Sequence, residues 1–421
     1  MSKRILYISY FYPPMGGPAV LRNLKTVKYL TQRGFSIDVV TPSDLEYLYR
    51  DESLAKQQQE RKLYRTHSMD PMAVIKTLRP KDRPHVSKLY LDTPESIKSM
   101  FRGIWPIDNK IGWVPFLIQT GKKALRENEY DLIYISMGPF SAGLGAYHLS
   151  KISGLPLVLD LRDYWTLLTD YETHNFAWQK ALNRHWEKKL YKHASLIATA
   201  TQGIGDDLCA AFGEHLAEKC VTIYNGWDEE DFVDLPEPDK DDGFVLAYFG
   251  SIYARRSLAK FYEAVARLRD EGNLPPNTSI KLYGNFFRAA TREAEASRVR
   301  DLIQFIPQLD HRLALIAMQS SHVLLLTLNS SGPKGTLSSK IFEYLRSQTP
   351  ILAMVPAHNE AAQLLRRCDQ DYICAMESTD SIYHCLKRLI REYDLNRRYS
   401  IPEDLQRERQ VQLLAEAIDS L

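Results

Sequence analysis

The feature that most constrains the fold is an alternation of short apolar runs with helical patterns, which continues along almost the whole chain. Apolar runs of this length are typical of strands that are buried on both faces, and the helical segments between them supply the crossover connections. The alternation therefore predicts an α/β protein built from doubly wound parallel sheets.

The individual elements follow from this pattern. Strands are predicted at Ile5–Tyr10, Ser36–Thr41, Leu132–Ser136, Leu157–Asp160, Leu196–Thr199 and Val221–Tyr224, and then at Phe244–Gly250, Ser279–Tyr283, Ile303–Ile306, Val323–Thr327, Ile351–Met354 and Tyr372–Ala375. Helices are predicted at Ala19–Arg33, Pro115–Asn128, Phe140–Ser153 and Phe176–His193.

The chain is predicted to contain two domains, because 421 residues exceed what one hydrophobic core ordinarily organises. The segment "DLPEPDKDDG" is acidic, carries two prolines and has almost no apolar content, which is typical of a linker. We expect one Rossmann-like domain over 1–235, a second over 243–395 and a helical tail over 396–421. In the tail, one helix face is formed by Leu405, Val411, Leu414, Ile418 and Leu421.

Composition excludes several classes of function. The formal net charge of +2 argues against nucleic-acid binding as the main role. The five cysteines have no metal-like spacing, which favours a reduced, cytoplasmic setting, and His311, His322 and His358 are too scattered for a zinc site. No apolar stretch is long enough to span a bilayer. No Walker loop, G-x-S-x-G or G-x-G-x-x-G motif is present, which makes a dehydrogenase an unfavourable interpretation.

Residues 54–126 interrupt the first half and contain no predicted strand. The segment holds fifteen Lys or Arg and six Asp or Glu, together with large apolar residues such as Trp105 and Trp113. Basic and aromatic residues in this mixture are typical of surfaces that contact anionic lipid headgroups. A solvated insertion whose aromatic residues cover the core is the alternative.

The stretch "YFYPPMGGPAV" lies between the first predicted strand and the first predicted helix. Glycines beside a helix start permit a ligand to approach bare backbone N–H groups. Gly16 and Gly17 are therefore candidate binding residues.

A second candidate site is "GTLSSKIFEYLRSQTPILAM", in which Ser338–Ser339 supplies a natural N-cap. A helix start offers free N–H groups and a positive dipole end, and Gly335 permits close approach of a diphosphate. Lys334 and Lys340 flank it, and Glu343 could accept hydrogen bonds from ribose hydroxyls. A capped surface helix is the alternative.

Three other strand ends carry polar residues. "YFGSIYARRS" places Arg255 and Arg256 after the strand that ends at Gly250, where arginine can clamp phosphate, although two solvated arginines are the more common case. "LVLDLRDYWT" places Asp160, Arg162 and Asp163 in either a site or a structural ion pair. "IYNGWDEEDF" places Asn225 and Gly226 in a turn.

Taken together, these five stretches resemble, in order and over nearly the whole chain, retaining glycosyltransferases of the GT-B fold, specifically glycosyltransferase family 4. The similarity is closest to bacterial enzymes that build lipopolysaccharide, capsule or exopolysaccharide. It implies two Rossmann-like domains that face each other across a cleft, with the C-terminal helix crossing back to the first domain.

The resemblance also implies roles for individual residues. The donor would be bound by Gly16, Gly17, Gly250, Arg255, Arg256, Lys334, Gly335, Thr336, Leu337, Lys340 and Glu343. Arg256 and Lys340 would stabilise the leaving diphosphate, and Asp163 would assist the acceptor hydroxyl. Asp160, Arg162 and Asn225 would lie on the acceptor side.

Three positions depart from the family's pattern. The family's first glutamate falls at Gly335, and its active-site histidine has no match in "DLRDYW". Ser251 stands where an arginine is usual. These departures leave the sugar and the catalytic detail open.

The implied function is sugar transfer with retention from a UDP- or GDP-linked sugar, of the hexosyltransferase type, without a metal ion or other cofactor. The implied acceptor is a glycan or a polyprenyl-diphosphate-linked sugar. The implied location is the cytoplasm, with peripheral contact to the inner face of the plasma membrane. A nucleotide-sugar epimerase of the same fold and a non-catalytic partner that binds a nucleotide sugar are the alternatives.

Overall fold

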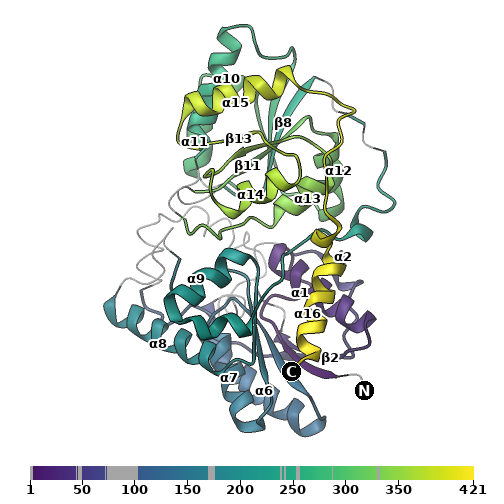
Figure 1. Cartoon of the computed structure of the whole chain (residues 1–421), viewed down its shortest axis with the longest axis vertical. Coiled ribbons are helices and arrows are strands. Elements are labelled where there is room, and N and C mark those ends of the chain that lie inside the picture. The colour runs from purple at the N-terminus through teal and green to yellow at the C-terminus, as the bar shows by residue number, and fades with distance from the viewer. Residues whose placement is uncertain are drawn as a thin grey trace, which may run out of the picture. The chain divides into compact units, whose positions relative to one another are not determined.

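The structure is a computed structural model, and it describes residues 3–43, 45, 50–71, 73, 103–168, 176–237, 239–240, 243–252, 257–286, 288–329 and 332–421 (Figure 1). The described residues fall into two compact units. The first unit comprises those within 1–168, 172–225 and 407–421, and the second comprises those within 226–406. None of the helices in these ranges is both long and apolar enough to cross a membrane.

The first unit is built on a sheet whose described strands follow the order β3-β2-β1-β4-β5-β6-β7. The strands are β1 (Arg4–Ile8), β2 (Ser36–Pro42), β3 (Lys62–Thr66), β4 (Leu132–Met137), β5 (Leu157–Leu161), β6 (Leu196–Thr199) and β7 (Cys220–Thr222). All of these strands pair in parallel. The order reverses between β1 and β4, which is the topological switch point where ligands bind in doubly wound sheets.

Helices cover both faces of this sheet. They are α1 (Pro18–Gln32), α2 (Glu52–Ala55), α6 (Val114–Glu127), α7 (Ala142–Ser153), α8 (Ala177–His193), α9 (Gln202–Phe212) and α16 (Arg407–Asp419). Successive side chains of a strand point to opposite faces, so Leu6 and Ile8 of β1 pack in the apolar cluster that also contains Leu117 of α6 and Leu190 of α8. Ile5 lies in the other cluster, with residues of α1 and α16.

The C-terminal helix α16 packs against the first unit beside α1 (Figure 1). Its buried side chains Val411, Leu414 and Ile418 lie in the apolar cluster that contains Ile5 of β1. Lys3 Nζ donates to the Ile418 carbonyl at 2.7 Å. The predicted apolar face is therefore correct at these positions, whereas Leu421 is exposed. The predicted return of the C-terminal helix to the first half of the fold is confirmed.

The prediction that residues 54–126 contain no strand is wrong, because β3 lies there. β3 pairs in parallel with β2 at the edge of the sheet. Lys62 and Arg65 are exposed while Tyr64 and Thr66 are buried, so charges interrupt the apolar run that marks a central strand. Charged side chains on edge strands discourage pairing with other chains, and here they also hide the strand from a search for apolar runs.

The second unit repeats the doubly wound plan. Its described strands follow the order β10-β9-β8-β11-β12-β13, and all pairs are parallel. The strands are β8 (Phe244–Phe249), β9 (Thr278–Tyr283), β10 (Ile303–Ile306), β11 (Val323–Thr327), β12 (Ile351–Met354) and β13 (Ile373–Cys374). The switch point lies between β8 and β11.

The helices of the second unit are α10 (Ala259–Asp270), α11 (Arg288–Glu295), α12 (His311–Ser320), α13 (Lys340–Arg346), α14 (Glu360–Arg367) and α15 (Thr379–Arg391). Short 3₁₀ turns occur in the two units at Ile111–Trp113, Glu214–Lys219, Glu229–Asp231, Arg300–Leu302 and Glu403–Leu405. Tyr248 of β8 packs in one apolar cluster with Phe261 of α10 and Leu386 of α15. The predicted fold class, α/β with two doubly wound parallel sheets, is confirmed.

The described part of the predicted linker binds the second unit. The Arg312 guanidinium donates to the Asp234 carbonyl, and Lys240 Nζ donates to the carbonyls of Gln319 at 2.8 Å and Ser321 at 2.6 Å. The N-terminal part of the first unit ends at Asn225, before the expected boundary at residue 235, and the unit also contains residues 407–421.

The ends of β8 and β9 meet at two glycines. Gly250 and Gly284 have φ angles of 116° and 144°, a region that L side chains rarely adopt. A Cβ atom added to Gly284 would lie 2.5 Å from the Gly250 carbonyl oxygen. The close approach of these backbones therefore requires glycine at position 284.

We expect Gly284→Ala to lower the free energy of unfolding by at least about 3 kcal/mol, because backbone strain adds to the overlap with Gly250. Gly272→Ala is the matched control, because Gly272 also has a positive φ, 69°, but has open space around it. The control should cost about 1–2 kcal/mol. Urea unfolding of both variants would measure the difference, and equal losses would contradict the backbone contact.

Candidate functional site

The glycine pair of the opening stretch lies directly before α1. Gly17 precedes the first helical residue with φ 102°, and Gly16 is buried. Asn23 of α1 fixes the loop to the helix, because its Nδ2 donates to Ser9 Oγ at 2.7 Å and to the Phe11 carbonyl at 2.9 Å. The predicted position of both glycines at the start of a helix is confirmed, and the strand order places their loop beside the switch point between β1 and β4.

Asp160 and Asn225 belong to a buried network centred on Arg22. The guanidinium of Arg22 binds both carboxylate oxygens of Asp160, with Nη2–Oδ1 at 2.6 Å and Nε–Oδ2 at 3.0 Å. Its Nη1 donates to the Ile223 carbonyl at 3.0 Å and to Asn225 Oδ1 at 3.1 Å. Arg22 and Asp160 are almost completely inaccessible to solvent. Of the two interpretations of Asp160, the structure has the structural ion pair, and its carboxylate is not accessible to an acceptor.

Arg162 and Asp163 follow β5 and have different surroundings. Arg162 Nε donates to the Met137 carbonyl at 3.0 Å and Nη2 donates to the Gly138 carbonyl at 2.7 Å, so this side chain holds the turn after β4. Asp163 is exposed and has no hydrogen bond or ion pair to any residue that the structure describes. Asp163 is therefore the carboxylate of the stretch that remains open to a ligand.

In the second unit, α13 is attached to the end of β8. Lys340 Nζ donates to the Phe249 carbonyl and lies 4.2 Å from the centre of the Tyr248 ring. A Cβ atom added to Gly250 would lie 2.9 Å from the same Nζ. Tyr344, one turn further along α13, accepts the Phe249 N–H at 3.1 Å, and burial raises the pKa of its hydroxyl. The structure thus brings Gly250 and Lys340 together.

Glu343 is paired with a histidine that the sequence analysis considered only as a zinc ligand. His311 is the first residue of α12, and its Nε2 lies 2.8 Å from Glu343 Oε1. Both side chains remain partly exposed. The carboxylate is therefore oriented by a neighbouring helix, and its second oxygen can accept further hydrogen bonds.

The segment between β11 and α13 contains buried polar atoms that lack partners. Asn329 Oδ1 and Thr336 Oγ1 are buried and have no hydrogen-bond partner among the described residues. Gly335 is buried, Leu337 is half-buried and Lys334 is exposed. Unpaired buried polar atoms are costly unless a bound molecule or water completes them.

The structure tests the predicted N-cap of α13 but not the predicted arginines. Ser339 stands at the N-cap position of α13, but its side chain makes no capping hydrogen bond. Arg255 and Arg256 lie outside the described residues, as do residues 72 and 74–102 of the basic insertion.

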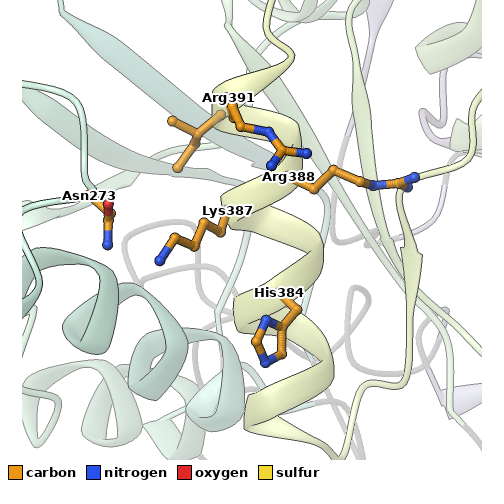
Figure 2. Close-up of a pocket in the computed structure, with 6 residues that line it drawn as sticks. Asn273, His384, Lys387, Arg388 and Arg391 are labelled. Carbon is orange, nitrogen blue, oxygen red and sulfur yellow. The ribbon is translucent and has the colours of Figure 1, made fainter.

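A shallow cavity of about 450 Å³ lies between the ends of α10 and α15. Figure 2 shows His384, Lys387, Arg388 and Arg391 of α15 around it, with Asn273 opposite. Its cations already have partners: Lys387 pairs with Glu271, Arg388 with Asp371 and Arg391 with Glu392. The cavity also contains none of the predicted site residues. We therefore do not assign the donor to it.

No group of three or more His, Cys, Asp or Glu side chains within the described ranges is arranged to hold a metal ion. None of the five cysteines, all of which lie in the described ranges, forms a disulfide.

Comparison with known proteins gives the family. The sequence profile of glycosyltransferase family 4 matches residues 21–231, which is half of the chain. No curated protein matches the chain.

Solved structures give the same fold. HepE from Anabaena, in complex with UDP and glucose, has a TM-score of 0.61 at 16% identity and covers 99% of this chain and 95% of its own. Sucrose-phosphate synthase from Thermosynechococcus elongatus has a TM-score of 0.61 at 13% identity, over 100% and 94% of the two chains. The lipopolysaccharide outer core galactosyltransferase WaaB has a TM-score of 0.57 at 12% identity, over 99% of each. The two parallel sheets are those of the GT-B fold.

We expect Arg22→Met to lower the free energy of unfolding by about 3–5 kcal/mol, because Asp160 is left buried without its partner. The double variant Arg22→Met/Asp160→Leu should recover most of this loss, because no charge is then buried. Arg391→Met, in an exposed pair with Glu392, is the control and should change stability by less than about 1 kcal/mol. Urea unfolding of the three variants would measure these differences in the free energy of unfolding. A double variant no more stable than the single one would contradict the ion-pair assignment.

Proposed function

This chain belongs to glycosyltransferase family 4, and we propose that it transfers a sugar from a nucleoside-diphosphate sugar to an acceptor hydroxyl with retention of configuration. The observation that carries the proposal is the family match over residues 21–231, together with the GT-B fold of the whole chain. UDP is the first donor nucleotide to test, because HepE, which has the same fold, was solved with UDP and glucose. GDP is the second.

The proposed donor site lies in the second unit, at the end of β8 and the start of α13. Lys340 would place its ammonium against the donor diphosphate, because its hydrogen bond to the Phe249 carbonyl holds that ammonium at the end of β8. Gly250 leaves backbone exposed beside it. The unpaired atoms Asn329 Oδ1 and Thr336 Oγ1 support a polar ligand in the segment that also contains Lys334, Gly335 and Leu337.

Glu343 would hold the ribose hydroxyls. A carboxylate that is oriented before binding loses little side-chain entropy when the ligand arrives, and His311 orients this one at 2.8 Å. His311 thereby becomes a positioning residue of the proposed site.

The proposed chemistry is stabilisation of a leaving group. Cleavage of the sugar–phosphate bond builds negative charge on the diphosphate, and fixed cations stabilise that charge as it develops. Lys340 and Arg256 are the proposed cations, without a metal ion. Asp163, which is exposed after β5, is the proposed carboxylate for the acceptor hydroxyl, and Gly16 and Gly17 are the proposed backbone contacts to the transferred sugar.

The proposed biological role is assembly of a bacterial cell-surface polysaccharide in the cytoplasm. WaaB, which shares the fold, is a lipopolysaccharide outer core galactosyltransferase. A glycan or a polyprenyl-diphosphate-linked sugar is the proposed acceptor, and a lipid-linked acceptor would require peripheral contact with the membrane.

We expect UDP, in a panel with GDP, ADP, CMP and dTDP, to raise the melting temperature of the protein in the presence of EDTA. Ligand at 100 times its Kd adds about 2.7 kcal/mol of stability. Glu343→Ala should weaken binding at least roughly tenfold, since it removes a hydrogen bond to a charged group. Glu377→Ala, an exposed carboxylate of the same unit, is the control and should leave the shift unchanged.

Two outcomes would contradict the donor site. If no nucleotide shifts the melting temperature, the second unit does not bind a donor as proposed. If Glu343→Ala binds as tightly as wild type, the ribose contact lies elsewhere. Nucleotide binding without sugar transfer or donor hydrolysis would favour a non-catalytic partner, and an epimerised sugar in the products would favour an epimerase.

A further inference from the structure

The surface of α8 in the first unit has a composition unlike that of an ordinary solvated helix. The helix contains five Lys or Arg residues and a single acid, Glu187, which is completely buried. Glu187 accepts hydrogen bonds from Thr166 and from Tyr191 Oη at 3.0 Å, and burial raises its pKa. The charges that α8 presents to solvent are therefore exclusively positive.

The N-terminal end of the same helix exposes large apolar side chains. Trp178 is 54% exposed and Phe176, which directly precedes the helix, is 52% exposed. Ile104, from the basic insertion, is 62% exposed. Single exposed apolar residues are ordinary, but a group of large ones beside a basic face is typical of contact with another apolar phase.

A buried glutamine brings these three residues together. Gln179 Nε2 donates to the carbonyls of Gly103 at 2.9 Å and Trp105 at 2.7 Å, the two residues that flank Ile104. Its Oε1 accepts the Phe176 N–H at 3.2 Å. Gln179 itself is completely buried. The arrangement of the apolar group is therefore fixed by hydrogen bonds.

The basic residues continue from Trp178 along one side of the helix. Trp178, His185, Lys188 and Lys192 are exposed, and their spacings of seven, three and four residues place them on one stripe. At 1.5 Å per residue the stripe is roughly 21 Å long. It begins with aromatic residues and ends with lysines.

We propose that the α8 surface, formed by Ile104, Phe176, Trp178, Lys188 and Lys192, binds the headgroup region of an anionic lipid bilayer. Trp and Phe favour the membrane interface, and lysine stems can lie along it while their ammonium groups meet lipid phosphates. The absence of an exposed acid on α8 gives the charge complementarity that this partner requires. The proposal specifies the peripheral membrane contact of the proposed function, and it rests on that function only for its biological purpose.

The test is co-sedimentation of the full-length protein with vesicles, without any nucleotide sugar. Wild type should bind vesicles that contain phosphatidylglycerol, should not bind vesicles of phosphatidylcholine alone, and should be released by high salt. Trp178→Ala/Lys188→Glu/Lys192→Glu should lower the partition coefficient at least roughly tenfold, since each lysine near an anionic surface contributes roughly fivefold.

The matched control is Leu395→Ala/Arg366→Glu/Arg398→Glu, which removes one exposed apolar residue and makes the same change in charge on the second unit. It should bind vesicles as wild type does. Circular dichroism and the nucleotide-induced shift in melting temperature would show that both triple variants are folded.

Three results would overturn the proposal. The first is no binding of wild type to phosphatidylglycerol vesicles, and the second is binding of the α8 variant as tight as that of wild type. Wild type could also form a dimer in lipid-free sedimentation that the α8 variant does not form, which would assign the surface to a second copy of the chain. None of these results depends on sugar transfer, so they are distinguishable from a failure of the proposed enzymatic function.

Discussion

The first unit depends on one buried ion pair. Burial lowers the pKa of the Arg22 guanidinium, but Asp160 more than offsets this effect, so the pKa stays above its ordinary value and the charge is kept. A buried guanidinium is tolerated only when its donors are satisfied, and here they bind a carboxylate, a carbonyl and an amide oxygen. The pair thereby joins α1, the end of β5 and the turn after β7. The same helix also fixes the glycine loop through Asn23.

The second unit also attaches a helix to the end of a strand, but through single hydrogen bonds instead of a buried ion pair. Lys340 and Tyr344 attach α13 to the end of β8 through the carbonyl and the N–H of Phe249. The first contact is partly buried and the second is buried, and together they fix the first turns of α13 relative to β8. In the proposed reaction, an ammonium that is held at a strand end would meet the developing negative charge without reorganisation, which is the condition for electrostatic catalysis.

The sequence is sufficient for the central strands but not for the edge strand β3 or for the long-range pairs. Strands buried on both faces, such as β11 and β12, are uninterrupted apolar runs and were predicted with their observed bounds. β3 alternates charged and buried residues and was missed. The sequence leaves two interpretations of Asp160 open because its partner Arg22 is 138 residues away, and no local pattern links His311 to Glu343, which lies 32 residues later. Such pairs become visible only when the topology brings the helices together.

The basic insertion predicts membrane contact from composition alone, and that prediction does not say which residues would make the contact. Its excess of Lys and Arg predicts contact with an anionic surface, and its exposed Ile104 is positioned by Gln179 of a helix that begins more than 70 residues later. Gln179 makes this combination possible. Its buried amide binds three backbone groups, and these hydrogen bonds hold the neighbouring apolar side chains in exposed positions. Under the membrane proposal, the lipid headgroup region would cover these side chains. Under this proposal a lipid-linked acceptor would meet the first unit at its membrane surface, while the proposed donor residues Lys340 and Glu343 belong to the second unit.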